Sequence, residues 1–305
     1  MPNKRIFYAS HAVSVDGTVV VGAQSVGINT NFNLEQVFQL GRLAIYDNIA
    51  TDPDVEITIS KVLDGYPTIW ELATTGGSLV QHANDQSTII LAVDDETQDF
   101  IANPHTSAIT MTGCYVSSLN YTFPVDGNLT EEIVFVGSHK EVGGTVNTPP
   151  ADPNTRVLRR QNVAISECTF PDMVTGRRLS QISISADLGR EKMFALGQLA
   201  PFHRFVNFPL EITISFDVIS DGEDANVLVG PEFDETNLEC AGINIEKEPI
   251  VIKLCDAEGV IAYTFDLGSG CSLQSVSYGG GDTGGGNVTE TYTYITYNEL
   301  TITGW

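Results

Sequence analysis

Basic residues are scarce in this chain of 305 residues, which has 15 lysines and arginines against 39 aspartates and glutamates, a formal net charge of −24. A nucleic-acid clamp needs basic patches to neutralise phosphates, so this balance argues against one. The acidic surface favours solubility, or it serves to repel polyanions. Apolar runs are also short, and none approaches the length of a membrane span. Residues 1–17 lack the apolar core of a signal peptide, so we expect a soluble chain that does not use that export route.

The residue patterns of catalytic and metal sites are missing too. The sequence contains no nucleophile elbow, no Walker loop and no histidine pair at metal-binding spacing. Its five cysteines form no CxxC motif, and we expect buried free thiols in a reducing cytosol. Acidic turns at residues 94–96 and 221–224 do not follow the spacing of a calcium loop, which favours solvated turns. We therefore expect no catalytic residue, no cofactor and no metal site.

The chain does contain an internal repeat. The pentapeptide EITIS occurs at residues 56–60 and again at 211–215, a spacing of 155. Other matches follow at spacings of 156 to 159, namely LGRLA at 40–44 with LGQLA at 196–200, Cys114 with Cys271, Tyr121 with Tyr278, and NLTE at 128–131 with NVTE at 287–290. Loop insertions between kept strands produce such a drift, so the sequence predicts two copies of one unit. We place the first domain at residues 1–148, a Pro-rich linker at 149–155 and the second domain at 156–305.

Alternation of apolar and polar residues predicts strands in most of each unit. In residues 210–218 every second side chain is apolar, which indicates a strand with one buried face, and residues 55–60 repeat the pattern. Further strands are predicted at 88–93, 110–123, 132–136, 250–254, 260–265 and 289–303.

Helix is scarce by comparison. PTIWELA at residues 67–73 is the best helix, 225–229 its degraded counterpart, and a short turn is predicted at 34–40. The Gly-rich stretch 279–287 has no following helix and no nearby lysine, so it predicts a flexible hairpin tip and not a phosphate loop. We predict a mainly β fold, with two tandem antiparallel β-sandwiches or barrels that each have at most one short helix.

Two segments of the first copy resemble the tail tube proteins of tailed bacteriophages. Residues 21–74 resemble their N-terminal part, and residues 114–137 resemble their closing strands, with a Tyr-x-Phe-x-Val-Asp-Gly hairpin at 121–127. Together they cover about half of the first copy. The second copy replaces that hairpin with the Gly-rich tip and lacks a clear PTIWELA helix, so the two copies are not equivalent.

The resemblance implies a structural protein of the virion tail, made in the host cytoplasm and without enzyme activity. Tail tube proteins stack as rings, usually hexameric, whose inner strands join into one β-barrel around a lumen. Duplicated members supply six units from three chains, so the resemblance implies trimeric, pseudo-hexameric rings in a helical assembly. It further implies contacts with itself, with other tail proteins at the tube ends or a sheath, and with DNA that passes during ejection without specific binding. Ring closure would also remove the unpaired strand edges of a lone unit.

Two sets of residues are candidates for roles in such a tube. The polar sides of the EITIS strands are candidates for the lumen lining, or form an ordinary solvent-facing side: Glu56, Thr58, Ser60, Glu211, Thr213 and Ser215. Apolar residues without strand alternation are candidates for ring-to-ring contact, or cover the unit's own core: Leu34, Val37, Phe38, Leu40, Phe194 and Leu196.

Two other classes of function stay open from the sequence. One is another β-rich virion or surface component, such as a decoration, baseplate or glycan-binding protein. The other is a hydrolase on a β-sandwich. Glu35 and Glu56 recur as Glu191 and Glu211, and an active site rarely needs two copies in one chain, so the repeated carboxylates disfavour the hydrolase.

Overall fold

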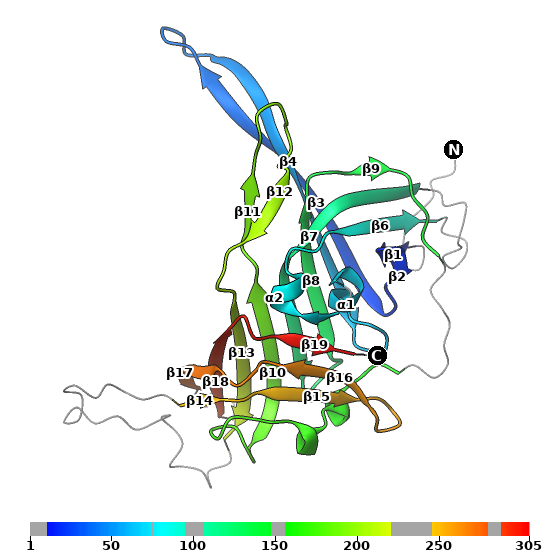
Figure 1. The fold of residues 1–305 in the computed structure, drawn as a ribbon, viewed down its shortest axis with the longest axis vertical. Helices are drawn as coiled ribbons and strands as arrows, with labels where there is room; N and C mark the ends of the chain where they lie inside the picture. The colour runs from blue at the N-terminus through cyan, green and yellow to red at the C-terminus, as the bar shows by residue number, and fades with distance from the viewer. Residues whose placement is uncertain are drawn as a thin grey trace, which may run out of the picture.

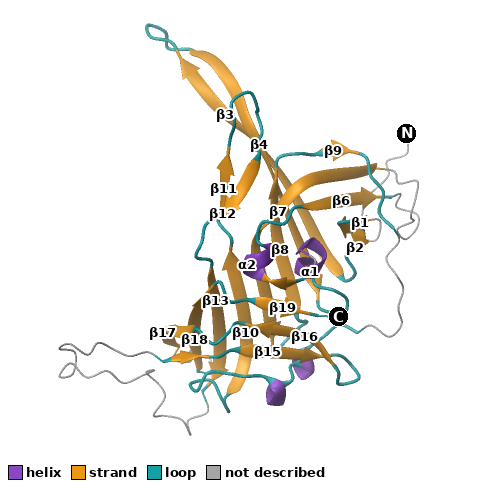
Figure 2. Cartoon of the chain, viewed as in Figure 1, coloured by secondary structure: helices purple, strands orange, loops and turns teal. Residues whose placement is uncertain are grey.

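The computed structural model describes residues 11–74, 76–94, 107–147, 156–220, 246–279 and 288–304, and strand dominates them (Figures 1 and 2). Its helices are short: α1 (Ile69–Thr74), α2 (Leu79–His82) and two 3₁₀ turns at Arg160–Asn162 and Ile165–Glu167. The sheets are antiparallel throughout, which confirms the predicted mainly β fold.

One long sheet crosses the molecule and contains eight main strands in the order β3-β4-β8-β7-β10-β13-β18-β17. Their bounds are β3 (Ala23–Phe38), β4 (Ile45–Val62), β7 (Ser107–Pro124), β8 (Thr130–Gly137), β10 (Arg178–Asp187), β13 (Glu211–Ile219), β17 (Cys271–Gly279) and β18 (Thr289–Tyr297). The first four strands come from the N-terminal half of the chain and the last four from the C-terminal half. The two halves are therefore joined edge to edge, through β7 and β10.

Smaller groups of strands surround the long sheet. The N-terminal part of β7 continues into a group formed by β1 (His11–Val15), β2 (Thr18–Val19), β6 (Ser87–Val93) and β9 (Glu141–Val142), and β14 (Lys247–Glu248) pairs with the start of β17. A separate four-stranded sheet contains β15 (Val251–Cys255), β16 (Ile261–Asp266), β19 (Thr301–Thr303) and β5 (Gly77–Ser78). A detached hairpin consists of β11 (Arg190–Met193) and β12 (His203–Val206).

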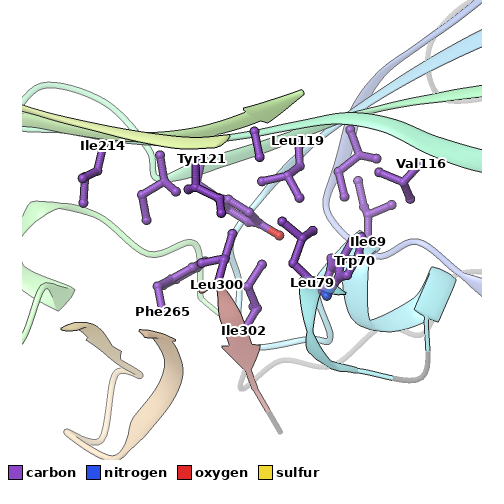
Figure 3. Close-up of a cluster of buried hydrophobic side chains, with 14 of the residues drawn as sticks. Ile69, Trp70, Leu79, Val116, Leu119, Tyr121, Ile214, Phe265, Leu300 and Ile302 are labelled. Atoms are coloured by element: carbon purple, nitrogen blue, oxygen red, sulfur yellow. The ribbon is translucent and has the colours of Figure 1, made fainter. Parts of the chain in front are cut away.

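The core lies between the long sheet and the layer formed by the four-stranded sheet and the helices (Figure 3). In Figure 3, Tyr121 and Ile214 point from the long sheet toward Leu300 and Phe265 of the opposing layer. The rings of Tyr121 and Phe265 meet edge to face, with 4.8 Å between their centroids. Because strand side chains alternate, the same strands turn their polar residues to the opposite face, which this layer does not cover.

Most predicted elements are present. The helix at 67–73 corresponds to α1, and the strands predicted at 88–93, 110–123, 132–136, 250–254 and 260–265 correspond to β6, β7, β8, β15 and β16. The strand predicted at 289–303 is interrupted, because Asn298 has a left-handed φ of 62° that ends the run before β19. Helix α2 was not expected from the sequence.

The turn predicted at residues 34–40 is wrong. β3 continues to Phe38 and pairs with β4 along this stretch. Both faces of the hairpin are exposed here, so no buried side imposes the alternation that would mark a strand. The predicted helix at 225–229, the linker at 149–155 and residues 280–287 of the Gly-rich tip lie outside the described residues.

Candidate assembly surfaces

The two halves of the long sheet have the same internal register. Across the four strands of the first half, one row of opposed residues runs Val26, Ile59, Ile133 and Leu119. In the second half, the matching row runs Ile182, Phe216, Tyr292 and Val276. Corresponding residues differ by 156, 157, 159 and 157 positions. The register shift between Val116 and Ser118 in β7 also recurs between Leu273 and Ser275 in β17. The sequence repeat is therefore a repeat of strand pairing.

The two copies of EITIS do not occupy corresponding positions within it. Ile59 of β4 corresponds to Phe216 of β13, a spacing of 157, whereas the copies of EITIS are 155 apart. Glu56 thus corresponds to Thr213, not to Glu211. A shift by two residues keeps every side chain on its own face of the sheet, so the match predicts the face correctly and the register wrongly.

The pairing of β7 with β10, here called the internal seam, joins the two halves. It extends from Pro124 opposite Gln181 to Ser118 opposite Asp187. On the core face of this seam, Tyr121 is fully buried. The strands that correspond to β10 and β7 are β3 and β17, the two outer strands of the long sheet.

Most of the outer edge of each of these strands has no partner strand in the described ranges. Among the described residues, β3 pairs only with β4, and β17 pairs with β18 and, at two positions, with β14. Tyr278 of β17 corresponds to Tyr121, yet it is 52% exposed where Tyr121 is 0% exposed. A strand added along this edge would lie beside Tyr278 as β10 lies beside Tyr121.

The face of the long sheet turned away from the core, here called the polar face, contains all six candidate lining residues. Glu56 and Glu211 are exposed on it, while Thr58, Ser60, Thr213 and Ser215 are half-buried. One row of hydroxyl side chains crosses five strands at Thr122, Ser183, Ser215, Thr293 and Ser275. The charged side chains of the polar face are mostly acidic. Arg178 lies at the lower end of the sheet, and the carboxylates are Glu56, Glu132, Asp187, Glu211 and Asp217.

Two hairpins project from the upper end of the sheet (Figure 1). The longer one, here called the arm, is the outer part of β3 and β4, and the shorter one is β11–β12. Both tips turn at a left-handed glycine, Gly41 with φ 85° and Gly197 with φ 87°. The candidate contact residues are largely exposed: Leu34 65%, Phe38 67%, Leu40 103%, Phe194 54% and Leu196 106%, with Val37 half-buried. They therefore do not cover the core of their own chain.

Ion pairs attach the shorter hairpin to the base of the arm. Lys192 Nζ lies 2.8 Å from Asp52 Oδ2 and 2.6 Å from Asp54 Oδ2, and Arg204 Nη2 lies 2.8 Å from Asp54 Oδ1. Burial raises the pKa of Asp54, but the hydrogen bonds from Lys192 and Arg204 outweigh it and lower the pKa. In the first half, the opposed pair that corresponds to Lys192 and Arg204 is uncharged, Gln36 and Asn48. The arm therefore lacks the two cations that make this contact in the shorter hairpin.

Each half also buries one glutamate at the same position of its repeat. Glu131 accepts hydrogen bonds from the backbone N–H groups of Ile69 and Trp70, at 2.8 and 3.2 Å, and from Tyr121 OH at 2.7 Å. Burial raises the pKa of Glu131, and the charge of the buried Lys61 partly opposes that shift. The Glu131 carboxylate, on β8, therefore caps the start of helix α1.

The second buried glutamate is Glu290. Its carboxylate accepts two hydrogen bonds from Arg177, at 2.8 and 3.2 Å, and one from Tyr292 OH at 2.6 Å. Both glutamates lie at matching positions of the sequence repeat, which indicated no role for them. A signal for Glu131 was Lys61, on the apolar side of a strand pattern, since a buried lysine requires carboxylates nearby, here Asp64 at 3.4 Å and the cross-strand neighbour Glu131.

Glu290 should make the stability of the protein depend on acid pH. Burial raises the pKa of Glu290, but the hydrogen bonds of Arg177 and Tyr292 outweigh it and hold the pKa below its usual 4.5. A lowered folded-state pKa contributes stability that is present above 4.5 and is lost as the pH falls through the folded value. Glu290→Gln should therefore cost about 3 kcal/mol at pH 7. Urea unfolding below pH 4.5 should show the cost shrinking, and a cost that stays constant would contradict the expectation.

The thiols and histidines form no site in the described part of the chain. Cys114 and Cys271 are buried at corresponding positions, as predicted, and burial raises their pKa to about 12 and about 11. Cys168 and Cys255 are also free, and Cys240 lies outside the described residues. Within the described ranges, no group of three or more His, Cys, Asp or Glu side chains could hold a metal ion. The acidic turn at 221–224 and most of that at 94–96 lie outside these ranges. None of the helices described is long and apolar enough to span a membrane.

Comparisons with known proteins add little to this geometry. No family model and no curated protein matches the sequence. Among solved structures, the chain is similar to "Structure of Hcp1 from Flavobacterium johnsoniae". The identity is 12%, the match covers 46% of this chain and 99% of that chain, and the TM-score is 0.30. A match with so low a TM-score supports no conclusion about function.

Proposed function

We propose that the chain is a tube-forming structural protein whose copies join edge to edge, β3 of one copy against β17 of the next, into a closed ring. The internal seam supports this proposal, because it already joins the corresponding edges within one chain. If the outer edges pair in the register of the internal seam, Ile28 of one chain lies opposite Tyr278 of its neighbour, as Ile184 lies opposite Tyr121. Ring closure would satisfy the free backbone groups of both edges.

The register of the internal seam also sets a strand tilt that suits a closed barrel. The row of opposed residues that starts at Val26 crosses the first half to Leu119, which lies opposite Ala186 of β10. The residue of β10 that corresponds to Val26 in the repeat is Ile182. The sheet thus steps by 186 − 182 = 4 residues for every four strands. One residue per strand, at a rise of about 3.3 Å and a strand spacing of about 4.8 Å, gives a tilt of about 35°, as in closed barrels.

Three chains give this barrel a lumen of useful width. They supply eight main strands each, and at the same spacing and tilt twenty-four strands close at a backbone diameter of about 45 Å. Two chains would close at about 30 Å, and side chains on both walls would leave too little room for a DNA duplex. The resemblance to tail tube proteins likewise favours three chains with six units.

The polar face becomes the inner wall of such a ring. The four-stranded sheet and the helices cover the other face, so closure places this layer on the outside. Glu56, Thr58, Ser60, Glu211, Thr213 and Ser215 then line the lumen, where short hydroxyls offer DNA few partners and carboxylates repel its phosphates. We propose that this lumen conducts DNA in a bacteriophage tail, a structural role without catalysis.

Electron microscopy of the purified protein tests the proposal. Negative-stain images should show rings or tubes with a central channel, and a reconstruction should show three chains per ring with Glu56 and Glu211 on the inner wall. Protein that stays a monodisperse monomer at high concentration would exclude the tube. If that monomer bound a glycan, another β-rich virion or surface component would replace it.

A further inference from the structure

The two ends of the long sheet have surfaces that complement each other. The arm extends from the upper end, and β7 and β10 meet at the lower end (Figure 1). β4 runs down from the arm and β7 runs down to Pro124, so the strands connect these two ends. Stacking one copy above another along the strands therefore brings the arm tip of one toward the lower end of the other.

The arm tip exposes two leucines completely. Leu40 and Leu43 are 103% and 106% exposed, and Arg42 stands between them, with its backbone N–H bonded to Gln39 O at 3.2 Å. No described part of the chain covers these leucines. Fully exposed apolar side chains gathered at a projecting tip are typical of a surface that another molecule buries.

A hollow opens at the lower end of the internal seam. The end of β7, the start of β10 and the segment of the 3₁₀ turns line it. The lining is mostly apolar, with Phe123, Val125, Val163, Ile165, Leu179 and Ile182, and Arg160, Ser180 and Gln181 add polar groups. Ile165 is 56% exposed at this hollow. Asp126 follows Val125 in the chain, and its side chain is 94% exposed with Arg160 3.7 Å away. Such an exposed pair is weak and leaves the carboxylate open to a second cation.

We propose that the arm tip of one copy docks in this hollow of a copy in the next ring. Leu40 and Leu43 then pack against Ile165, and Arg42 approaches Asp126. The proposal rests on the proposed ring and specifies the contact that stacks one ring on the next. The contact joins two different surfaces and does not close on itself, so it repeats without limit along an axis, as a tube requires.

Charge placed in either surface should block stacking and leave rings intact. Ile165→Asp, and separately Leu43→Lys, should raise the protein concentration at which tubes appear by about tenfold or more, since each removes apolar contact area and buries a charge. The combined variant places the two new charges together and should restore tubes to near the wild-type concentration. Val260→Asp is the matched control, because Val260 is 62% exposed in the turn before β16 of the outer layer.

Ring and tube populations by negative stain and sedimentation velocity, with melting temperatures to verify folding, separate the outcomes. Rings without tubes in both single variants, with rescue in the combined one, support the docking site. If the Ile165→Asp variant forms tubes at the same concentration as the wild type, the docking site is overturned and the ring proposal stands. The docking site is likewise overturned if Leu43→Lys blocks stacking but the combined variant does not recover. Wild-type protein that forms no rings overturns both proposals.

Discussion

Tyr278→Asp should convert the protein from rings to monomers. On the outer edge of β17 this side chain is half exposed, and in the proposed ring β3 of the neighbouring chain would lie beside it, as β10 lies beside Tyr121. Loss of the buried aromatic area, together with desolvation of the new carboxylate, should weaken each β3–β17 contact between chains by about 3 kcal/mol, which is about a hundredfold in the association constant. Light scattering after size exclusion should then give the mass of one chain instead of three.

The folded chain should tolerate this change, because the side chain is already half in water. Tyr297→Asp is the matched control, since Tyr297 is 47% exposed on the polar face at the end of β18, away from the free edges. It should leave ring formation unchanged. Rings of Tyr278→Asp as stable as those of the wild type would show that β17 is not a ring contact.

Glu131→Ala should have the largest effect on folding. It removes the acceptor of two backbone N–H groups at the start of α1 and of Tyr121 OH, and it leaves the buried Lys61 with Asp64 as its nearby carboxylate. Breaking a buried charged network on one side costs about 3–5 kcal/mol. Equilibrium unfolding in urea measures the loss, preferably in Tyr278→Asp protein, where assembly does not contribute.

The neighbouring residue provides the control. Glu132 points to the polar face and is exposed, so Glu132→Ala should change the free energy of unfolding by no more than about 0.5 kcal/mol. Removing both charges, in Lys61→Met with Glu131→Leu, should cost less than the two single changes combined, because the two residues are cross-strand neighbours in one buried network, although Asp64 then loses its cation. Additive costs would show that the two residues do not act as one network.

The sequence predicted the strands well where one face is buried. Residues 210–218 alternate because Ile212, Ile214 and Phe216 face the core, and that alternation identifies a strand without any knowledge of its partners. The arm could not be predicted in this way, because its side chains are in water on both faces. The break at Asn298 was missed because a left-handed residue inside a run of β-formers leaves no periodic signal.

The candidate surfaces were predicted in part. The repeat indicated which segments correspond, but the strongest match, EITIS, was two residues out of register, and only strand pairing corrects that. The free edges could not be located, since strand order depends on long-range pairing. Tyr278 was noted as the counterpart of Tyr121, yet nothing local distinguishes a tyrosine at a free edge from one inside a seam. The buried pair of Arg177 and Glu290 is 113 residues apart in the chain and leaves no local pattern.

The internal seam has a kinetic consequence. To complete the proposed ring, six separate units would need five successive associations at the bulk protein concentration, followed by closure of the sixth contact. In a duplicated chain, three of those six contacts form during folding, between partners held together by the backbone at an effective concentration in the millimolar range. Incomplete rings with an odd number of units cannot form, because the units arrive in fixed pairs. In the proposed ring, the covalent connection would thus lower the molecularity of assembly and leave the architecture of the barrel unchanged.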